Sequence, residues 1–520
     1  MLNRKKLSLL IATTLVSFSL VGTIPVNATP VKGEKEQTKT TVKAKENNNQ
    51  KLTIMMYMDA DNNLEPYLLN DIEKKKKGYV DNPNLNVIIL VDRAKGESED
   101  ASVLGENFTD TRMYKLQNHK AVRIDGGNEF PEITTTSNYE ANMGDANTLK
   151  KFINSCKANY KADKYMLLMS DHGGGTRKHN NKDLNKAICW DDTNNDDCIY
   201  MSELSDVLTK DQSVDLLAFD ACLMGTAEVG YQFRPNNGSF EAKYLVASSP
   251  SEWGYGYQYD KIFSRLRDDI KTNGEEDLTL GGKEKCYNPS TVTAKELGAL
   301  LVEEQRDSTT KGEATDQELS CYDLSKAKEV KTSVDALSRN LSEENKQTAI
   351  ENLRGYCGYN GNVTMHYFDD SEDWGWRAYP YFDLYDLCSQ INNSNKFSDK
   401  TKELAKNVMK SVDNMVLYSF GGTDYQGFKD GKNGLSIFLP DGNKVYRDKR
   451  TGKELTHWQS QGWYSPLDTN KELQIPYGKL SWCKDGIDPK ENKVGNWFEL
   501  LDSWFDSSND KSGGVNHYQW

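Results

Sequence analysis

Two side chains with reactive chemistry, an imidazole and a thiol, follow two apolar segments of strand length. His172 comes two residues after the segment Tyr165–Ser170, and three glycines follow it. Cys222 comes three residues after the segment Val214–Phe219. Short apolar segments bounded by polar or glycine-containing sequence predict buried strands, and sites in open α/β sheets are built at the carboxyl ends of strands. We therefore expect both side chains at one edge of a sheet.

A cysteine and a histidine placed in this way have the chemistry of a nucleophile and its base. A thiol attacks a carbonyl carbon as the thiolate, so it needs a nearby base, and the start of a helix adds a favourable positive field. Cys222 lies where the predicted strand gives way to a predicted helix. His172 is the only one of the six histidines at a strand end before glycines, which favours it as the base. The alternative is a core cysteine and a turn histidine, and each residue taken alone favours that alternative.

The glycines after His172 also fit a different class of enzyme. A His-Gly-Gly-Gly segment forms the oxyanion hole of many lipases and esterases, whose serine nucleophile lies in a Gly-x-Ser-x-Gly turn. No serine in this chain has glycine at both second-neighbour positions, which excludes that class. The glycines are still suited to acyl transfer, because a backbone N–H without a side chain can approach a developing oxyanion.

The elements that must position these residues alternate between strand and helix patterns. Alternation of this kind predicts βαβ units around a largely parallel sheet, which is an α/β fold. No internal repeat of fixed period is present. Strands are expected at Lys51–Met58, Leu85–Val91, Tyr165–Ser170, Val214–Phe219, Tyr244–Ser249 and Gly434–Pro440, and helices at Leu64–Lys77, Asn147–Asn159, from Leu223, and at Ala294–Arg306, Ser325–Leu341 and Thr401–Leu417.

Both ends of the chain have distinctive composition. Residues 1–28 combine a basic start, an apolar stretch and a small-residue cleavage site, which predicts a secretory signal peptide. Residues 29–50 are polar, contain no aromatic side chain, and are interpreted as a removable pro-segment. Residues 441–520 contain six of the ten tryptophans, which predicts a packed C-terminal appendage.

The overall charge and the cysteines exclude several classes of protein. The net charge of −13 gives no basic surface for nucleic acid, and the mean hydropathy of −0.76 excludes a polytopic membrane protein. The nine cysteines have no repeating spacing and no Cys-x-x-Cys pair, which argues against a disulfide scaffold and a zinc site. An odd number leaves one thiol unpaired if the others bond, as expected when one cysteine is chemically active.

Several motifs together resemble the clostripain family of cysteine peptidases, in the caspase-like clan. The resemblance covers residues 51–520 and implies a caspase-like α/β/α sandwich and a secreted, calcium-dependent endopeptidase that cleaves after arginine. It implies that Cys222 is the nucleophile, that His172 is the general base and acid, and that the N–H groups of Gly173 and Cys222 form the oxyanion hole. The matching segments are Asp59–Glu65, His172–Gly175, Cys189–Asp192, Phe219–Gly225, Gly434–Pro440 and the Trp-rich tail.

Asp220 offers a physical account of a preference for arginine. It stands two residues before Cys222, so on a strand both side chains point to the same side. A carboxylate can bind a guanidinium through two hydrogen bonds, whereas lysine, expected to be cleaved more weakly, is a point charge. The residues alone leave open that Asp220 caps a helix starting near Leu223, and the resemblance favours the pocket. The expected pocket also includes Ser248 and Ser249, with Glu252 as a weaker second acid.

A polar loop after the histidine has a basic residue at each end. Cleavage after Arg177 and Lys186 would release residues 178–186, and members of the family mature into a light and a heavy chain by cleavage here. The expected light chain is 51–177 and the heavy chain 187–440, and the two are expected to remain associated. Lys186 stands where the family pattern has arginine. Either the enzyme is not strictly specific for arginine, or residues 178–186 are not completely removed.

Calcium is implied by the resemblance, but the sequence assigns no ligands. Asp59, Asp61 and Asn63 begin like an EF-hand loop, yet Leu64 replaces the required glycine and no glutamate closes the loop. The acidic segment Asp191–Asp197 could supply oxygen ligands or could be a solvated loop. A second function also stays open at this stage, a noncatalytic secreted adhesin that binds a surface through the Trp-rich tail.

Overall fold

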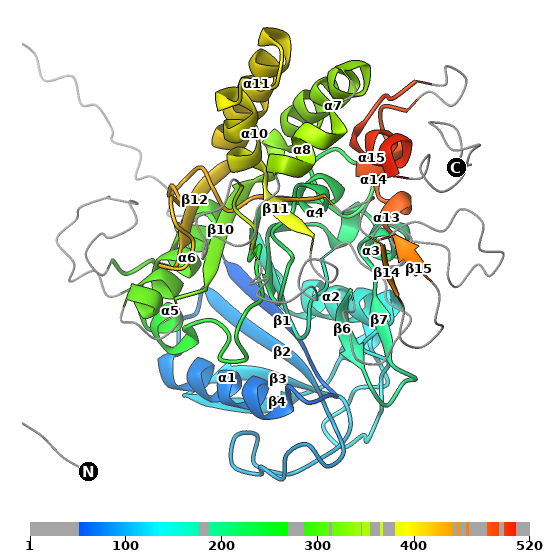
Figure 1. Ribbon diagram of the computed structural model, residues 1–520. Coiled ribbons are helices and arrows are strands. Elements are labelled where there is room, and N and C mark those ends of the chain that lie inside the picture. The colour runs from blue at the N-terminus through cyan, green and yellow to red at the C-terminus, as the bar shows by residue number, and fades with distance from the viewer. Residues whose placement is uncertain are drawn as a thin grey trace, which may run out of the picture. The chain divides into compact units, whose positions relative to one another are not determined.

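A nine-stranded sheet forms the centre of the molecule (Figure 1). Its strands run in the order β12-β10-β9-β8-β5-β1-β2-β3-β4. The five strands from β9 to β2 are parallel, and antiparallel pairs complete both edges. The strands are β1 (Leu52–Ala60), β2 (Leu85–Arg93), β3 (Arg112–Gln117), β4 (Lys120–Ile124), β5 (Lys164–Ser170), β8 (Val214–Asp220), β9 (Ala242–Ala247), β10 (Glu318–Asp323) and β12 (Val416–Gly421).

The computed structural model describes residues 51–175, 187–268, 285–310, 315–344, 346–353, 364–367, 380–439, 445–447, 454–456, 476–487 and 493–505. The predicted signal peptide and pro-segment and the predicted cleavage sites Arg177 and Lys186 lie outside these residues. Within the described residues, no helix is both long enough and apolar enough to cross a membrane.

Helices cover both faces of the sheet, because neighbouring residues of its strands point into two different cores. Met55 and Tyr57 of β1 belong to one core, and Met56 and Met58 belong to the other. The second core is completed by α1 (Glu65–Gly78), α5 (Tyr259–Arg265) and α6 (Ala294–Thr310). The first is completed by α2 (Ala146–Asn159), α3 (Met201–Val207), α4 (Ala227–Gln232), α7 (Ala327–Glu344), α8 (Gln347–Leu353), α10 (Leu384–Asn393) and α11 (Asp399–Met415).

This arrangement confirms the predicted α/β/α sandwich with a mainly parallel sheet. Three small strand pairs lie outside the central sheet. They are β6 (Ile188–Asp191) with β7 (Asp197–Ile199), β11 (Tyr381–Asp383) with β13 (Ser436–Phe438), and β14 (Val445–Arg447) with β15 (Glu454–Thr456).

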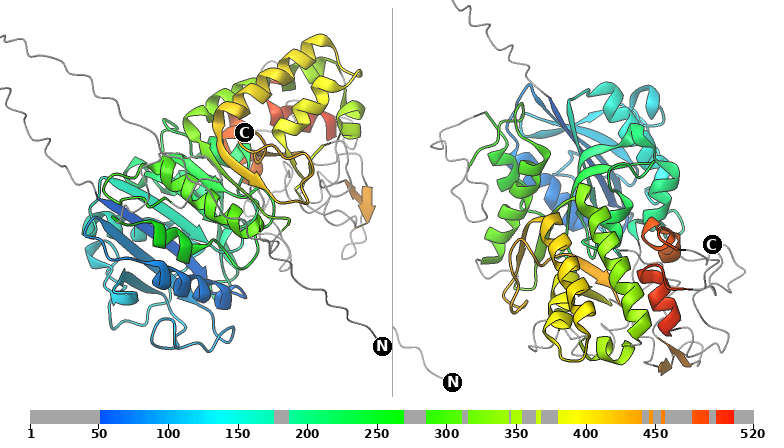
Figure 2. Two further views of the ribbon diagram at one scale, coloured as in Figure 1. Left: turned by 90° about the vertical axis from the view of Figure 1, so that its left-hand side faces the viewer. Right: turned by 90° about the horizontal axis from the view of Figure 1, so that it is seen from above.

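The described part of the C-terminal region packs into the first core. Its helices are α13 (Pro476–Lys479), α14 (Ser481–Lys484) and α15 (Trp497–Phe505), drawn in orange to red in Figure 2. Helix α13 lies beside α3, α14 beside α4, and α15 beside α7. Trp482 and Trp497 are almost completely buried there, and the Trp497 indole N–H donates to the Phe438 carbonyl at 2.9 Å. Large tryptophans are thus structural in this part of the chain.

The segment after β8 differs from the expectation. Helix α4 begins at Ala227 instead of near Leu223, and Thr226 caps it by accepting a hydrogen bond from the Val229 N–H. Leu223 has a φ of 65°, a left-handed conformation that ends any regular structure at this point. Asp220 is therefore not the cap of this helix, and Cys222 lies in a turn before the helix.

Candidate active site

Strands β5 and β8 bring the two reactive side chains to the same edge of the sheet. They pair in parallel with Ser170 opposite Asp220, so their carboxyl ends finish at the same level. The Asp171 N–H donates to the Asp220 carbonyl at 3.4 Å and extends the pairing by one residue. His172 and Cys222 follow directly and line the same pocket, which has a volume of about 290 Å³.

The walls of this pocket come from four parts of the chain. The ends of β5 and β8 form one side, and helix α1 contributes Tyr67 and Asp71. The loop after β9 contributes Ser251, Glu252 and Trp253. The pocket is therefore assembled from residues that are up to nearly two hundred positions apart in the sequence, and only the parallel sheet brings them together.

The His172 ring is oriented by a residue that sequence reasoning missed. Nε2 of His172 lies 2.8 Å from Oδ1 of Asn63. Asn63 follows β1, which pairs with β5 so that Met58 is opposite Ser170. The preceding Asn62 donates through Nδ2 to Asp171 Oδ1, also at 2.8 Å, which fixes this turn beside the end of β5. The signal that could have found Asn63 was its position after a third strand of the same parallel group.

The Cys222 thiol lies against the loop that follows β9. The Glu252 N–H donates to Sγ at 3.2 Å, and Sγ is 3.6 Å from the Glu252 carbonyl. Burial raises the pKa of the Cys222 thiol, an effect that the hydrogen bond from the Glu252 N–H partly opposes. The nearby negative charge of Asp220 raises this pKa further. The thiol therefore favours its protonated form and needs a base to become a nucleophile.

Gly173 lies in close contact with the backbone of Cys222. A Cβ atom at position 173 would be 2.3 Å from the Cys222 carbonyl oxygen and 2.8 Å from its nitrogen, so no larger residue fits without a backbone shift. The next residue, Gly174, donates its N–H to the Ala187 carbonyl at 2.8 Å. That bond holds together the two ends of the loop whose predicted cleavage sites fall outside the described residues.

Asp220 is buried at the base of the pocket, with 7% of its surface exposed. Its carboxylate accepts a hydrogen bond from the Tyr259 hydroxyl. Asp71 lies nearby, because Oδ2 of Asp71 and Oδ2 of Asp220 would be 2.3 Å and 2.9 Å from a Cβ atom on Gly256. Burial raises the pKa of Asp71 to about 7, although the ammonium groups of Lys75 and Lys74 oppose this shift. The pocket is thus acidic and incompletely neutralised.

Ser248 and Ser249 are not brought into the pocket. Both side chains are completely buried, and neither lies among the residues that line it. The Ser249 hydroxyl lies within hydrogen-bond distance of two carbonyl oxygens, those of Gly225 at 2.7 Å and Gly434 at 2.8 Å, and donates its one proton to either. Their contacts hold the end of β9 in place, and the following residues, Ser251 to Trp253, form the wall instead.

A cluster of three carboxylates lies near the ends of β1 and β6. Oxygen atoms of Asp61, Glu140 and Asp191 are all within 4.8 Å of one another. Oε1 of Glu140 is buried and has no hydrogen-bond partner among the described residues, whereas Asp191 accepts the Met143 N–H at 2.7 Å. Burial and the neighbouring acids raise the pKa of Glu140 to about 8. Three hard oxygen donors at this spacing fit a calcium ion.

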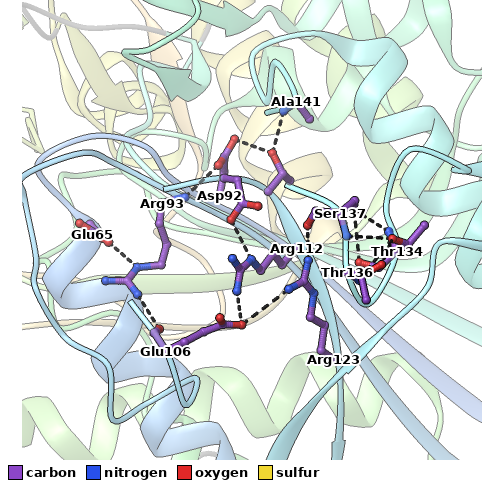
Figure 3. Close-up of polar contacts among 12 residues, drawn as sticks. Glu65, Asp92, Arg93, Glu106, Arg112, Arg123, Thr134, Thr136, Ser137 and Ala141 are labelled. Atoms are coloured by element: carbon purple, nitrogen blue, oxygen red, sulfur yellow. Dashed lines mark hydrogen bonds and ion pairs between the residues drawn. The ribbon is translucent and has the colours of Figure 1, made fainter. Parts of the chain in front are cut away.

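The arginines of the neighbouring strands are directed at other acids (Figure 3). Arg93 forms a buried ion pair with Glu65 at 2.5 Å, and Arg112 and Arg123 both contact Glu106. Asp92 accepts a hydrogen bond from Thr111 at 2.8 Å. These arginines therefore do not neutralise the three-carboxylate cluster. The sequence analysis included Asp61 and Asp191 in its acidic segments but missed Glu140. Glu140 is far from both residues in the sequence, so no local pattern connects it to them.

Comparisons with known proteins give consistent matches. The model of the clostripain family matches residues 56–504. Clostripain from Hathewaya histolytica is 58% identical over 527 residues, which cover 99% of this chain and 100% of that protein. The crystal structure of a secreted C11 cysteine protease from Bacteroides thetaiotaomicron, in complex with an irreversible peptide inhibitor, covers 84% of this chain and 99% of that chain. Its TM-score is 0.50 at 16% sequence identity, which is a likeness of fold.

Proposed function

Because the chain belongs to the clostripain family and is a cysteine endopeptidase, we propose that it is secreted and cleaves peptide bonds after arginine, and more weakly after lysine. The observation that carries this proposal is the common pocket of His172, Cys222 and Asp220 at the ends of β5 and β8. Membership of a peptidase family replaces the earlier alternative of a noncatalytic adhesin. The buried Trp482 and Trp497 also leave that alternative without its binding surface in the described part of the tail.

The proposed reaction begins with proton transfer from Cys222 to His172. Sγ attacks the backbone carbonyl carbon of the substrate arginine, and the carbonyl oxygen becomes an oxyanion. The backbone N–H groups of Gly173 and Cys222 donate hydrogen bonds to it, and stabilisation of this kind is worth about 3 kcal/mol for each donor. The imidazolium then gives its proton to the leaving amine. Water, deprotonated by His172, hydrolyses the thioester and restores the thiol.

Substrate selection in this proposal depends on the charge of the pocket. The arginine side chain enters beside Cys222, and its guanidinium pairs with Asp220. A guanidinium presents five donors in a planar fork, whereas an ammonium group presents a compact charge, so arginine gains more from a fixed carboxylate. Lysine is accepted more weakly for the same reason.

An affinity probe tests the proposal directly. A peptidyl-arginine chloromethyl ketone is expected to alkylate Cys222 rapidly, and the matching lysine probe more slowly. A norleucine probe, which keeps the length of the side chain but lacks its charge, is the control and should leave the protein unlabelled over the same time. Peptide mass spectrometry locates the modified residue. Labelling of a different cysteine, or equal rates for all three probes, would contradict the proposal.

Asn63 is expected to matter for catalysis although it does not touch the reacting atoms. In Asn63→Ala, loss of the 2.8 Å contact lets the His172 ring rotate, and kcat should fall about 10- to 100-fold with a small change in KM. Asn63→Gln should recover part of the loss. The pH profile of kcat should also change, because the contact stabilises one protonation state of the ring. A rise in KM with unchanged kcat would assign Asn63 to substrate binding instead.

Maturation is proposed to proceed by cleavage of the loop between residues 177 and 187. Arg177 and Lys186 match the preference of the enzyme itself, so the protein can act on its own precursor. The light chain, 51–177, contains β1 to β5, and the heavy chain, 187–440, contains β6 to β13. The pairing of β5 with β8 supports continued association of the two chains after cleavage. Secretion, with removal of residues 1–28 and then 29–50, completes the proposal.

Calcium is proposed to bind at the carboxylates of Asp61, Glu140 and Asp191. The ion would neutralise acids that repel one another. It would also connect the end of β1 to β6, beside the turn that contains Asn63. Asp61 and Asn63 belong to one turn, which connects this site to the position of His172.

Calcium binding is expected to raise the Tm of the protein. At a calcium concentration of about 100 times Kd, the expected stabilisation is about 2.7 kcal/mol. Calorimetric titration and thermal unfolding measure binding and stability separately from activity. Glu140→Gln should weaken binding at least tenfold, whereas Asp197→Asn, a change at an exposed acid outside the cluster, should not. Equal binding by the Glu140→Gln protein and the wild type would exclude this site.

A further inference from the structure

The carboxylate of Glu252 is buried and has no counter-charge among the described residues, in the pocket that holds Cys222. No described residue donates a hydrogen bond to either of its oxygens, and both oxygens are buried. The Asp220 side chain lies within hydrogen-bonding range of this carboxyl group. The Glu252 backbone contacts Sγ of Cys222, and the residue lines the pocket together with Asp220. An ionised carboxylate in such a place costs several kcal/mol unless a cation or hydrogen-bond donors compensate it. The resting protein has no such compensation among the described residues.

The charges around Glu252 are mostly negative. Burial raises the pKa of Glu252 well above its usual value, and the charges of Asp220, Cys222 and Glu318 raise it further. Two of the four ammonium groups of helix α1 lie near these acids, and both have other partners: Lys74 pairs with Asp71 at 2.9 Å, and Lys75 lies 3.5 Å from the centre of the Tyr259 ring.

Asp71 and Asp220 share the charge of Lys75 as well. The carboxylates of Asp71, Asp220 and Glu252 therefore lie near two ammonium groups, which leaves the pocket with a place for one more positive charge. The fourth nearby acid, Glu318, instead accepts hydrogen bonds from the Ser249 N–H and the Ser320 hydroxyl. The remaining groups on this side, Tyr257 and Tyr259, are neutral because burial raises the pKa of both.

We propose that Glu252 is a second specificity carboxylate, which is protonated in the empty pocket and ionised when a guanidinium is bound. Binding of arginine then releases one proton to the solvent, and the cation is held between Asp220 and Glu252. This inference rests on the proposed preference for arginine and adds the residue that strengthens it. A planar guanidinium can engage two carboxylates at once, whereas an ammonium group engages them less completely. Glu252 should therefore contribute more to arginine binding than to lysine binding.

The proposal fixes the pH dependence of binding. Below the pKa of Glu252 in the empty pocket, each bound arginine must displace one proton, so the Kd should fall tenfold for each unit of rising pH. Above that pKa the carboxylate is already ionised and Kd should become constant. Replacement of Glu252 by glutamine removes this titrating group and should reduce the magnitude of the slope of log Kd against pH by one, which leaves only the contribution of Asp71, whose pKa is about 7.

Calorimetry of the Cys222→Ala protein tests the inference, because this variant binds without turnover and removes the ionisation of the thiol. Acetyl-arginine amide and acetyl-lysine amide are titrated in phosphate and in Tris, whose different ionisation enthalpies reveal the number of protons released. The expected release is about one proton for the arginine ligand. The Cys222→Ala/Glu252→Gln protein, an isosteric control, should release about one proton fewer than the Cys222→Ala protein and should show a preference for arginine over lysine reduced about tenfold.

Two outcomes of this calorimetry would contradict different parts of the proposal. Tight binding of the arginine ligand without proton release by the Cys222→Ala protein would overturn the role of Glu252 and leave the proposed function intact, even if the glutamine variant did not fold. No preference for arginine over lysine in the Cys222→Ala protein would overturn the proposed specificity itself.

Discussion

Replacement of Cys222 by serine is expected to lower kcat on arginyl peptides by about 10⁴-fold or more and to leave the precursor as a single chain. The reason is that a hydroxyl is far harder to deprotonate than a thiol, and His172 is placed to activate the thiol. Turnover of an arginine anilide gives kcat, and intact-mass spectrometry of the purified precursor reports internal cleavage. Turnover of the anilide and internal cleavage of the precursor should be lost together, because both depend on the same nucleophile.

A matched control is available at Cys286, which is partly exposed and does not line the pocket. The Cys286→Ser protein should keep wild-type kcat and should mature normally. Normal turnover by the Cys222→Ser protein would remove Cys222 from its proposed role. Normal nicking of the Cys222→Ser precursor, in the absence of other proteases, would instead separate maturation from the activity of the enzyme.

Replacement of Asp220 by asparagine is expected to lower kcat/KM on arginyl substrates by about 10²- to 10³-fold, the usual effect of breaking a buried charge pair. The amide keeps the shape of the side chain and can still accept the hydrogen bond from the Tyr259 hydroxyl. The loss should therefore be specific to charged substrates. A citrulline substrate, which resembles arginine without its charge, should be cleaved slowly and equally by both proteins.

The comparison of kcat/KM among arginine, lysine and citrulline substrates shows whether Asp220 recognises the charge of the substrate. A uniform loss on all three would mean that the variant disturbs Cys222, two residues away, instead of substrate binding. An unchanged preference for arginine would transfer the specificity to Glu252 or Asp71, the other acids of the pocket.

The parallel core of the fold and the meeting of His172 with Cys222 could be predicted because both follow from local patterns. Apolar segments such as Val214–Phe219 are buried on both faces, and the ends of parallel neighbours must lie at one edge. The antiparallel edge strands β3, β4, β10 and β12 were not predicted from the sequence. The outermost strands β4 and β12 are partly exposed, and the mostly buried strands β3 and β10 contain polar residues such as Arg112 and Glu318 that interrupt the apolar pattern.

The contacts that refine the site could not be predicted, because they depend on the direction of side chains across long separations. Asn63 reaches His172 and Glu140 reaches Asp191 only through the register of the sheet and the course of loops. Ser248 and Ser249 were expected in the pocket on their sequence position, but tertiary hydrogen bonds turn them into the core. Residue type and spacing therefore identify candidates, and the register decides which of them meet.

Cleavage of the loop as proposed would divide the site between two polypeptides, because β5 and β8 lie on opposite sides of the loop and pair with each other. The imidazole would then belong to one fragment and the thiol to the other, so neither fragment alone would be an enzyme. Activity would be a property of a noncovalent heterodimer whose interface is the middle of a β-sheet. The two fragments could then be expressed separately as inactive proteins and reconstituted by mixing, and their dissociation would end proteolysis.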